Sequence, residues 1–355
     1  MALSLRRRMP AEWEKHDATW IAWPHHEPDW PGKLAPIPWV YAEIVRALSE
    51  YDHVEILCHD EAVAENARTL LGAHGVNPGR FRIHLVRSDR VWLRDSAPTG
   101  VLRADGVVDL VNWGFNGWAK YDNFGQDALI GAEIERISGL ARVIPKRPDN
   151  GERLVLEGGG IEVNGAGLML VTEEWLLTNT QIRNPGMTSG EYEQVFAEYL
   201  GVSDTIWLGE GAAGDDTHGH VDDIARFSSR DTVIVAYEQD PSDENHARSA
   251  DNLRRLQLAG EKHRLRIVNI PFPRAVIMNG ERLPASYANF YVANGVVLVP
   301  TFNDPADRVA LNGIAEAFPR YTVIGIHAVD LVWGLGTIHC LTQQQPSAAK
   351  RGAKK

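Results

Sequence analysis

The sequence predicts an α/β fold in which five hairpin–helix–strand units close into a ring. The first observation is a repeat, because two strands joined by a turn, a helix and a buried strand recur from Asp95, Glu157, His220 and Asn289. The second is that each of these units opens on a polar side chain. The third is that the two ends of the chain together supply a fifth unit, which contains Cys340. Units that are closed by both ends of the chain imply a ring around one axis.

The elements of each unit follow from the hydrophobic pattern, in which helices place apolar residues three or four apart and strands are short apolar or alternating runs. The first four units take strand pairs from residues 94–113, 157–172, 220–237 and 289–302, helices from 125–140, 189–201, 243–260 and 306–318, and closing strands from 141–144, 204–209, 265–270 and 321–326. The fifth takes strands from 338–344 and 20–25, a helix from 38–51 and a last strand from 53–58. No linker rich in Pro, Ser or Gly interrupts this series. We therefore expect a single domain over residues 1–346, followed by a flexible basic tail over residues 347–355.

Cys340 is the candidate nucleophile of the sequence. It lies in GLGTIHCLTQQ, where small residues precede it and hydroxyl and amide side chains follow, whereas Cys58 lies in the apolar run HVEILC. A near-surface thiol without a chemical role is the alternative for this stretch alone. In a closed ring, the polar side chains that open the units face one axis, so the thiol joins an imidazole and carboxylates. That combination is typical of Cys/His nucleophilic catalysis on a cationic substrate.

The stretch GDDTHGHVDD holds four aspartates and two histidines in ten residues. If the segment from His220 is a strand, His220 and Asp222 share one face. Asp215 and Asp216 fit a solvated loop, and we assign them no chemistry. A rival interpretation takes His218 and His220 with nearby aspartates as ligands of zinc or another divalent metal. This metal site requires remote ligands and leaves the cysteine without a role.

Seven motifs resemble the agmatine deiminase and bacterial peptidyl-arginine deiminase family, in the right order over roughly residues 9–346. They are MPAEWEKHDATWIAWPH, W-x-R-D, LEGGG, TEE-x-LL with RNPG, GDDTHGHVDD, PASYANFY with GVVLVPTF, and G-x-G-x-IHC-x-TQQ. The resemblance implies the pentein fold, a five-bladed α/β propeller of pseudo-symmetric ββαβ units. It also implies hydrolysis of a guanidinium group to a ureido group and ammonia, with no cofactor and no metal.

The resemblance also implies roles for individual residues. Cys340 matches the family's nucleophile, His220 its general acid and base, and Asp95 and Asp222 its guanidinium-binding carboxylates. Glu157 matches the acid of the LEGG motif. A guanidinium resists attack until carboxylates orient it. Two carboxylates beside the thiol are expected to raise the pKa of the thiol until a cation offsets their charge. Thiolate formation assisted by the substrate's own charge is therefore a reasonable hypothesis.

Three further residues are expected to contact the substrate: Asn289, Trp92 of the W-x-R-D motif, and His218. The sequence departs from the family pattern at His218, where agmatine-specific relatives commonly show Asp or Asn, and also at Trp175, Leu335 and Thr337. Agmatine is the favoured substrate, and peptidyl arginine, another guanidine and amidino transfer to an amine are the alternatives. The tryptophans of WIAWPHHEPDWPG either cover an aliphatic substrate chain or belong to the core. Arg94 and Arg183 are the candidates for a substrate carboxylate.

Composition narrows the class of protein further. The net charge is −11 and the pI is near 5.6, so nucleic acid and anionic membranes are poor partners. No apolar run approaches the roughly 20 residues of a membrane span, and two cysteines build no disulfide framework. The start of the sequence lacks the apolar region of a signal peptide. We expect a cytoplasmic enzyme that acts on a small cationic guanidine, and the sequence leaves the formation of a homo-oligomer open.

Overall fold

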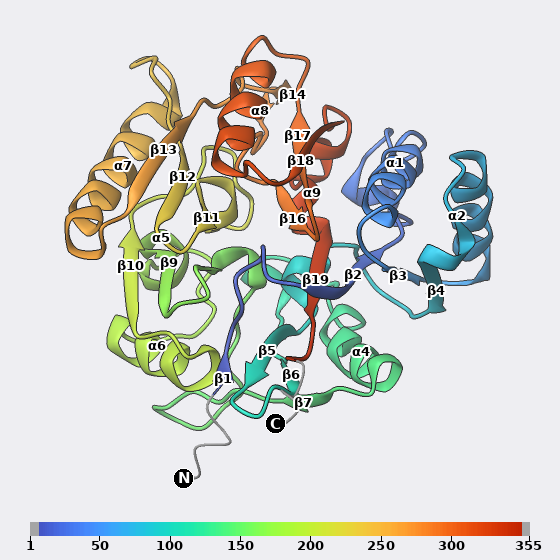
Figure 1. The fold of residues 1–355 in the computed structure, drawn as a ribbon, viewed down its shortest axis with the longest axis horizontal. Helices are drawn as coiled ribbons and strands as arrows, with labels where there is room; N and C mark the ends of the chain where they lie inside the picture. The colour runs from blue at the N-terminus through green and yellow to red at the C-terminus, as the bar shows by residue number, and fades with distance from the viewer. Residues whose placement is uncertain (1–6, 350–355) are drawn as a thin grey trace, which may run out of the picture.

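The computed structural model describes residues 7–349. Within these residues, five sheets of three or four strands are arranged around the middle of the molecule (Figure 1), and a sixth sheet is a two-stranded hairpin. In each of four units an antiparallel strand pair is followed by a helical segment and a strand parallel to the second one. The units are β5 (Thr99–Arg103), β6 (Val108–Val111), α4 (Ile130–Ser138) and β7 (Ala141–Val143); β8 (Glu162–Val163), β9 (Leu168–Thr172), α6 (Ser189–Val195) and β10 (Asp204–Leu208); β11 (Ala225–Ser229), β12 (Thr232–Ala236), α7 (Glu244–His263) and β13 (Arg266–Ile270); and β16 (Tyr291–Ala293), β17 (Val296–Thr301), α8 (Ala306–Ala317) and β18 (Thr322–His327). These elements match the residue ranges predicted from the sequence, except that α7 runs three residues and β18 one residue beyond the predicted end.

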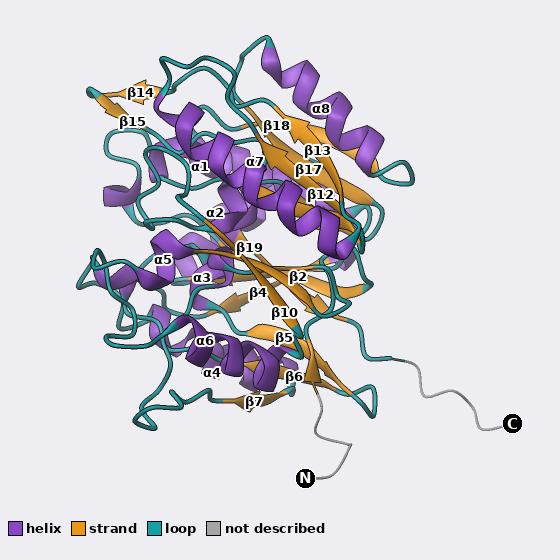
Figure 2. Cartoon of the chain, turned by 90° about the vertical axis from the view of Figure 1, so that its left-hand side faces the viewer, coloured by secondary structure: helices purple, strands orange, loops and turns teal. Residues whose placement is uncertain are grey.

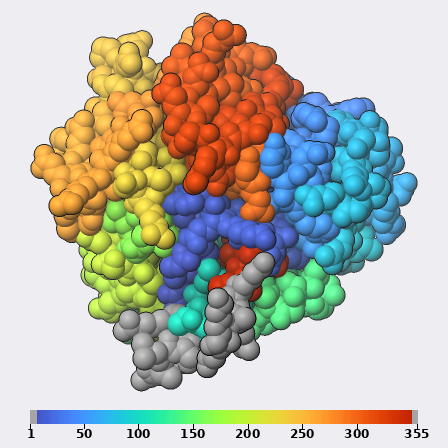
Figure 3. Space-filling view, in the orientation of Figure 1, coloured from blue at the N-terminus to red at the C-terminus, as the bar shows by residue number. Residues whose placement is uncertain are grey.

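The fifth unit is assembled from both ends of the chain, as predicted. Strand β19 (Thr342–Pro346) is antiparallel to β2 (His16–Ala22), and β2 continues through α1 (Ile37–Ser49) to the parallel strand β3 (Val54–Cys58). Figure 2 shows β19 running beside β2. In Figure 3, N-terminal residues in blue and C-terminal residues in red meet near the middle of one face. The pairing of β19 with β2 therefore closes the ring.

Several elements extend this plan. The helix α2 (Glu61–Ala73) and the strand β4 (Phe81–Leu85) widen the fifth sheet to four strands, β1 (Arg7–Arg8) is added to the edge of β5, and α5 (Glu173–Leu177) precedes α6. A short hairpin, β14 (Ile277–Met278) with β15 (Glu281–Arg282), lies between β13 and β16. The middle strands β9 and β12 are buried at every residue, since sheet partners and helices cover them.

The unit starts differ from the prediction that each polar residue opens a strand. Single helical turns precede the first strand in four units: α3 (Leu93–Ser96), Gly158–Gly160, Val221–Asp223 and α9 (Ile338–Leu341). In the remaining unit a tighter turn joins the Asn289 N–H to the Ser286 carbonyl at 3.4 Å. The prediction that His220 and Asp222 share a strand face is therefore wrong, because a helical turn and not a pleat brings them together.

The described part of the predicted tail is held against the protein. The Ser347 N–H donates to the Lys15 carbonyl at 2.8 Å, and the Ala349 N–H donates to the Gly106 carbonyl at 3.0 Å. The other residues of the predicted basic tail, 350–355, lie outside the described residues. Among residues 7–349, no helix combines the length and apolar composition that crossing a bilayer requires. The single-domain boundary at residue 346 remains a prediction.

Candidate active site

Cys340 lies in the short helix α9, at the inner end of the fifth unit. Its side chain is 8% exposed, and its Sγ lies 3.1 Å from Nδ2 of Asn289 and 3.7 Å from Oδ2 of Asp222. Burial, together with the charges of Asp222, Asp223 and Asp95, raises the pKa of Cys340 well above its ordinary value. In the free protein the group is therefore a neutral thiol.

Asn289 binds the turn that carries this thiol. Its Oδ1 accepts the Thr337 hydroxyl at 2.7 Å and the backbone N–H groups of His339 and Cys340 at 3.1 and 3.4 Å. Its Nδ2 donates to Asp223 at 3.0 Å as well as to Sγ. The side-chain amide of Asn289, which was expected to contact the substrate, is thus hydrogen-bonded to the nucleophile and to the turn that carries the nucleophile.

The imidazole of His220 lies between two carboxylates. Its Nδ1 is 3.8 Å from Oδ1 of Asp95 and its Nε2 is 3.5 Å from Oε2 of Glu157. Neither ring nitrogen has a hydrogen-bond partner within residues 7–349. Burial lowers the pKa of His220, but Asp95, Glu157 and Asp222 outweigh it and raise that pKa to about 9. The ring is therefore an imidazolium at neutral pH, with protons to give.

Glu157 supports His220 from a fully buried position. Its Oε1 accepts Nε of Arg183 at 3.1 Å, and its Oε2 accepts the indole N–H of Trp175 at 2.7 Å. Burial raises the pKa of Glu157, but Arg183 and His220 more than compensate and lower it to about 2. Glu157 therefore stays ionised, and Arg183 is committed to it. Trp175, a departure from the family pattern, supplies one of its hydrogen bonds.

Asp95 is a second buried carboxylate beside the imidazole. Its Oδ2 accepts the indole N–H of Trp118 at 2.8 Å, and its Oδ1 accepts the backbone N–H of Gly159 at 3.0 Å. Burial raises its pKa, His220 lowers it, and Asp222 and Glu157 raise it again, to about 6. Asp95 is therefore mostly ionised at neutral pH.

Asp222 completes the cluster with one committed and one free oxygen. Its Oδ2 accepts Nδ1 of His339 at 2.7 Å. Its Oδ1 is buried and has no hydrogen-bond partner among the described residues. Burial raises the pKa of Asp222, but the bond and charge of His339 outweigh it, so the pKa is lowered. An ionised oxygen without a partner is suited to accept N–H groups of a cation.

The glycines of LEGGG let these groups converge. A Cβ at Gly159 would lie 2.6 Å from Nδ1 of His220 and 2.9 Å from Oδ1 of Asp95. A Cβ at Gly160 would lie 2.4 Å from the Trp175 ring. Only glycine leaves room at these two positions for the imidazole, the carboxylate and the indole.

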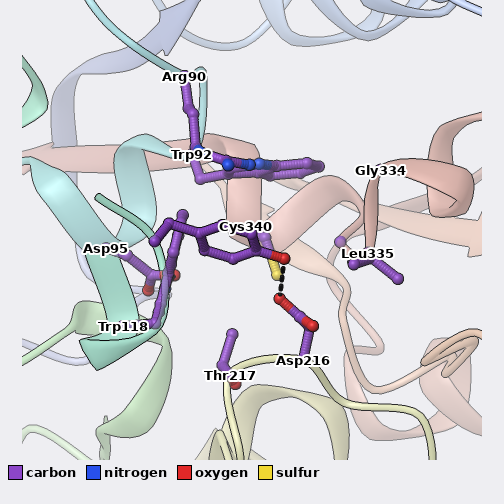
Figure 4. A pocket seen from close by; sticks show the side chains of 11 residues that line it. Arg90, Trp92, Asp95, Trp118, Asp216, Thr217, Gly334, Leu335 and Cys340 are labelled. Carbon is purple, nitrogen blue, oxygen red and sulfur yellow. Dashed lines mark hydrogen bonds between the residues drawn. The ribbon is translucent and has the colours of Figure 1, made fainter. Parts of the chain in front are cut away.

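A pocket opens onto Cys340 and Asp95, with aromatic walls and an aspartate at its side (Figure 4). Asp216 accepts the Tyr121 hydroxyl at 2.7 Å, which Figure 4 marks by the dashed line, and it also pairs with Lys120. Trp92 lines this pocket, as expected. The lining consists of Arg90, Trp92, Asp95, Trp118, Tyr121, Asp216, Thr217, Gly334, Leu335, Gly336 and Cys340.

His218 does not reach this pocket. Positive φ values at His218 (63°) and Gly219 (104°) turn the backbone, and the imidazole lies 3.7 Å from Glu174 in a separate cavity. His218 and His220 thus face different carboxylates. Across residues 7–349, no group of three or more His, Cys, Asp or Glu side chains is placed to hold a metal ion.

The tryptophans near the N-terminus belong to the core. Trp20 is 3% exposed, and Trp23 and Trp30 are fully buried. Each indole N–H donates within the protein, to Gln345, Asn66 and the Leu331 carbonyl respectively. Among the described residues, the tryptophans that line the Cys340 pocket are Trp92 and Trp118.

Asp215 and Asp216 lie in a half-buried loop, as predicted, but both accept hydrogen bonds within the protein. Oδ2 of Asp215 accepts the backbone N–H groups of Gly219 at 2.8 Å and His220 at 2.9 Å, and Oδ1 accepts that of Thr217. Asp215 therefore shapes the turn that delivers His220, and Asp216 lines the pocket. The Asp-x-Thr spacing, which is typical of an aspartate that bonds the backbone two residues on, was the available signal.

Comparison with known proteins identifies the family. The Porphyromonas-type peptidyl-arginine deiminase family matches residues 8–346. The agmatine deiminase of Pseudomonas aeruginosa (strain LESB58) is 33% identical over 97% of this chain and 96% of the relative, and that of Stutzerimonas stutzeri (strain A1501) is 34% identical over 96% and 95%.

Solved structures confirm the predicted pentein fold. The agmatine deiminase of Enterococcus faecalis superposes with a TM-score of 0.87 at 28% identity, over 97% of this chain and 96% of that one. The substrate-bound agmatine deiminase of C. jejuni has a TM-score of 0.86 at 24% identity and covers 97% of both chains, which bears on the fold alone.

Proposed function

We propose that this chain, which belongs to the Porphyromonas-type peptidyl-arginine deiminase family, converts agmatine and water to N-carbamoylputrescine and ammonia. As a C–N hydrolase that acts on guanidino groups, it would do so through a covalent Cys340 intermediate. The observation that carries this proposal is the buried cluster at the pocket: Cys340 and Asp95 line the pocket, Asp222 lies beside the Cys340 thiol, and the His220 imidazolium lies beside Asp95. This set matches the needs of a planar cationic substrate.

In the proposed complex, Asp95 and Asp222 accept N–H groups of the guanidinium. The free Oδ1 of Asp222 and the partly engaged carboxylate of Asp95 provide the acceptors. Two charge-assisted contacts fix the plane of the guanidinium and hold its central carbon over Sγ of Cys340. Substrate positioning and charge neutralisation are thus carried by the same two side chains.

The substrate cation also activates the nucleophile. Burial and neighbouring carboxylates keep Cys340 protonated in the free protein. A bound guanidinium cancels much of this negative field, so its arrival lowers the thiol pKa and favours loss of the thiol proton to solvent, which leaves the thiolate. The proposal therefore places thiolate formation after substrate binding.

The first half-reaction releases ammonia. The Cys340 thiolate attacks the guanidinium carbon and forms a C–S bond, giving a tetrahedral adduct. His220 transfers a proton to the departing nitrogen, the C–N bond breaks, and ammonia leaves a cationic amidino thioester. The second half-reaction runs through water: neutral His220 accepts a proton from water, and the hydroxide attacks the same carbon. The C–S bond then breaks, the hydroxyl proton of the adduct passes to the departing sulfur, and the ureido product and the neutral thiol are released. Glu157, which stays ionised, orients the ring throughout.

The pocket wall supports agmatine as the substrate. Trp92, Trp118 and Tyr121 provide apolar surface for a short methylene chain, and Asp216 provides a carboxylate for a distal ammonium. The relatives cited above are named agmatine deiminases, which agrees with a substrate that carries cations at both ends.

Replacing Asp216 with asparagine is expected to raise KM for agmatine about fivefold, because an ammonium loses a partly exposed charge partner worth about 1 kcal/mol. The KM for n-butylguanidine, which has no distal charge, is expected to stay unchanged. Steady-state kinetics on both substrates measure the difference, and Asp122→Asn, at an exposed position nearby, is the matched control for lost charge. Equal effects on both substrates would remove Asp216 from recognition of the distal amine.

The pH profile of kcat/KM is expected to be a bell with limbs near pH 6 and pH 9. Below about 6, Asp95 takes up a proton and no longer attracts the guanidinium. Above about 9, His220 loses the proton that the leaving ammonia requires. These two groups are 3.8 Å apart, so the limbs describe the pair. A rate that keeps rising through pH 10 would mean that ionisation of the thiol controls the reaction and that His220 does not act as the acid.

A product assay tests the function itself. Purified protein is incubated with agmatine, and ammonia and N-carbamoylputrescine are measured in parallel with a peptidyl-arginine substrate. Equal amounts of the two products are expected from agmatine. Adding glycine or ornithine distinguishes hydrolysis from amidino transfer, since a new guanidino product in place of ammonia would identify a transferase.

A further inference from the structure

His339, next to the nucleophile in sequence, lies between two carboxylates. Its Nδ1 is 2.7 Å from Oδ2 of Asp222, and its Nε2 is 2.9 Å from Oε2 of Glu12. The His339 side chain is 1% exposed. Glu12 belongs to the N-terminal MPAEWE segment, for which neither the sequence nor the proposed reaction gives a role.

The two carboxylates that face the ring of His339 are held in the ionised form. Burial raises the pKa of Glu12, but Arg226, His339 and Arg94 outweigh it and hold that pKa well below its usual range. The pKa of Asp222 is also lowered. Ionised carboxylates only accept hydrogen bonds, so each ring nitrogen of His339 is placed to donate to one of them.

His339 is one member of a buried series in which basic and acidic side chains alternate. Beyond Glu12, Nη2 of Arg226 lies 2.9 Å from Oε1 of Glu12, and Nε of Arg226 lies 2.9 Å from Oε2 of Glu162. Nη2 of Arg94 approaches Oε2 of Glu12 at 3.3 Å. The charged groups around His339 are therefore Asp222 on one side and, on the other, Glu12 with its two arginines. All are buried, so each charge depends on its neighbours.

We propose that His339, oriented by Glu12, is a positioning residue for Asp222. Its bond to Oδ2 fixes the carboxylate so that the unpartnered Oδ1 faces the guanidinium. Its charge keeps Asp222 ionised and weakens the repulsion that Asp222 exerts on the Cys340 thiolate, whose Sγ lies 3.7 Å away. This role deepens the proposed deimination and rests on it, since it assigns Asp222 to the substrate cation.

Binding without turnover provides the test. In a Cys340→Ala background, which removes the nucleophile, calorimetry measures the affinity of n-butylguanidine from pH 5 to pH 9. Adding His339→Gln is expected to weaken binding at pH 7 about 10- to 100-fold. It is also expected to move the acid limb upward by about one pH unit from the position that Asp95 sets, because buried Asp222 without its cation then takes up a proton at a higher pH than Asp95 does. A purely structural role would lower the melting temperature without moving this limb.

The matched control is His16→Gln in the same background. His16 is also buried, and its Nδ1 lies 3.4 Å from Oδ2 of Asp52, away from the residues that line the pocket. This control is expected to change the melting temperature and leave binding as in Cys340→Ala. If His339→Gln prevents folding, Glu12→Gln gives the second variant, with a smaller effect in the same direction.

Two results would overturn the inference, and they are distinguishable. The first is a folded His339→Gln variant with unchanged affinity and an unchanged acid limb, which would show that His339 does not position Asp222. If His339→Gln does not fold, the same result in Glu12→Gln would show this. Absence of binding in Cys340→Ala alone would count against the proposed function, and this inference would fall with it.

Discussion

Replacing Cys340 with serine is expected to reduce ammonia release from agmatine by about 10⁴-fold or more, because a serine hydroxyl does not ionise where even the thiol is held protonated. Agmatine binding is expected to persist, since Asp95 and Asp222 remain. Ammonia release and calorimetric titration of the same preparation separate the two effects. A loss of turnover with retained binding is the signature of a missing nucleophile.

The second cysteine provides the control for this prediction. Cys58 is fully buried in β3, and burial raises its pKa to about 12. Cys58→Ala is expected to lower the melting temperature and preserve kcat. Iodoacetamide is expected to inactivate the wild type by modifying Cys340, and agmatine is expected to slow this reaction. Turnover by Cys340→Ser above about one hundredth of the wild-type rate would contradict nucleophilic catalysis.

The positions of the central side chains could be predicted from the sequence because they recur at equivalent points of a repeat. Asp95, Glu157, His220 and Cys340 each precede the first strand of a unit, and closure of the ring brings them to one place. The local conformation could not be predicted in the same way. A strand was expected at His220, but the segment folds as a helical turn. The backbone N–H of His220, at the start of this turn, donates a hydrogen bond to Asp215.

Long-range partners account for the rest of the difference. His339 and Glu12 are 327 residues apart and meet only because the two ends of the chain share one unit. Neither the His-Cys pair nor the MPAEWE segment encodes that contact locally. The direction of His218 depends on a positive φ that a single sequence does not reveal. This residue was expected to contact the substrate, but the backbone turns its side chain away from the pocket.

Replacing His220 with asparagine is expected to lower kcat for agmatine by about 10³- to 10⁴-fold, because no proton donor then remains for the leaving ammonia. Asparagine fills a similar volume but offers neither the charge nor the titrating group that lies between Asp95 and Glu157. Rapid quenching followed by mass spectrometry of the intact protein tests whether the covalent adduct forms at all. Slow ammonia release with the other side chains intact is the expected result.

The matched variant is Glu157→Gln, which leaves His220 in place and removes one of the carboxylates that raise its pKa. Since His220 must be protonated to act as the acid, a lower pKa moves the alkaline limb of kcat/KM from near pH 9 toward neutrality, and the activity at pH 6.5 falls less than that at pH 8.5. His220→Asn has no such limb, because the titrating group is absent. Two outcomes would show that the proton for ammonia comes from a group other than His220. One is an alkaline limb that stays near pH 9 in a folded Glu157→Gln variant. The other is a His220→Asn variant that keeps more than about a tenth of the wild-type kcat.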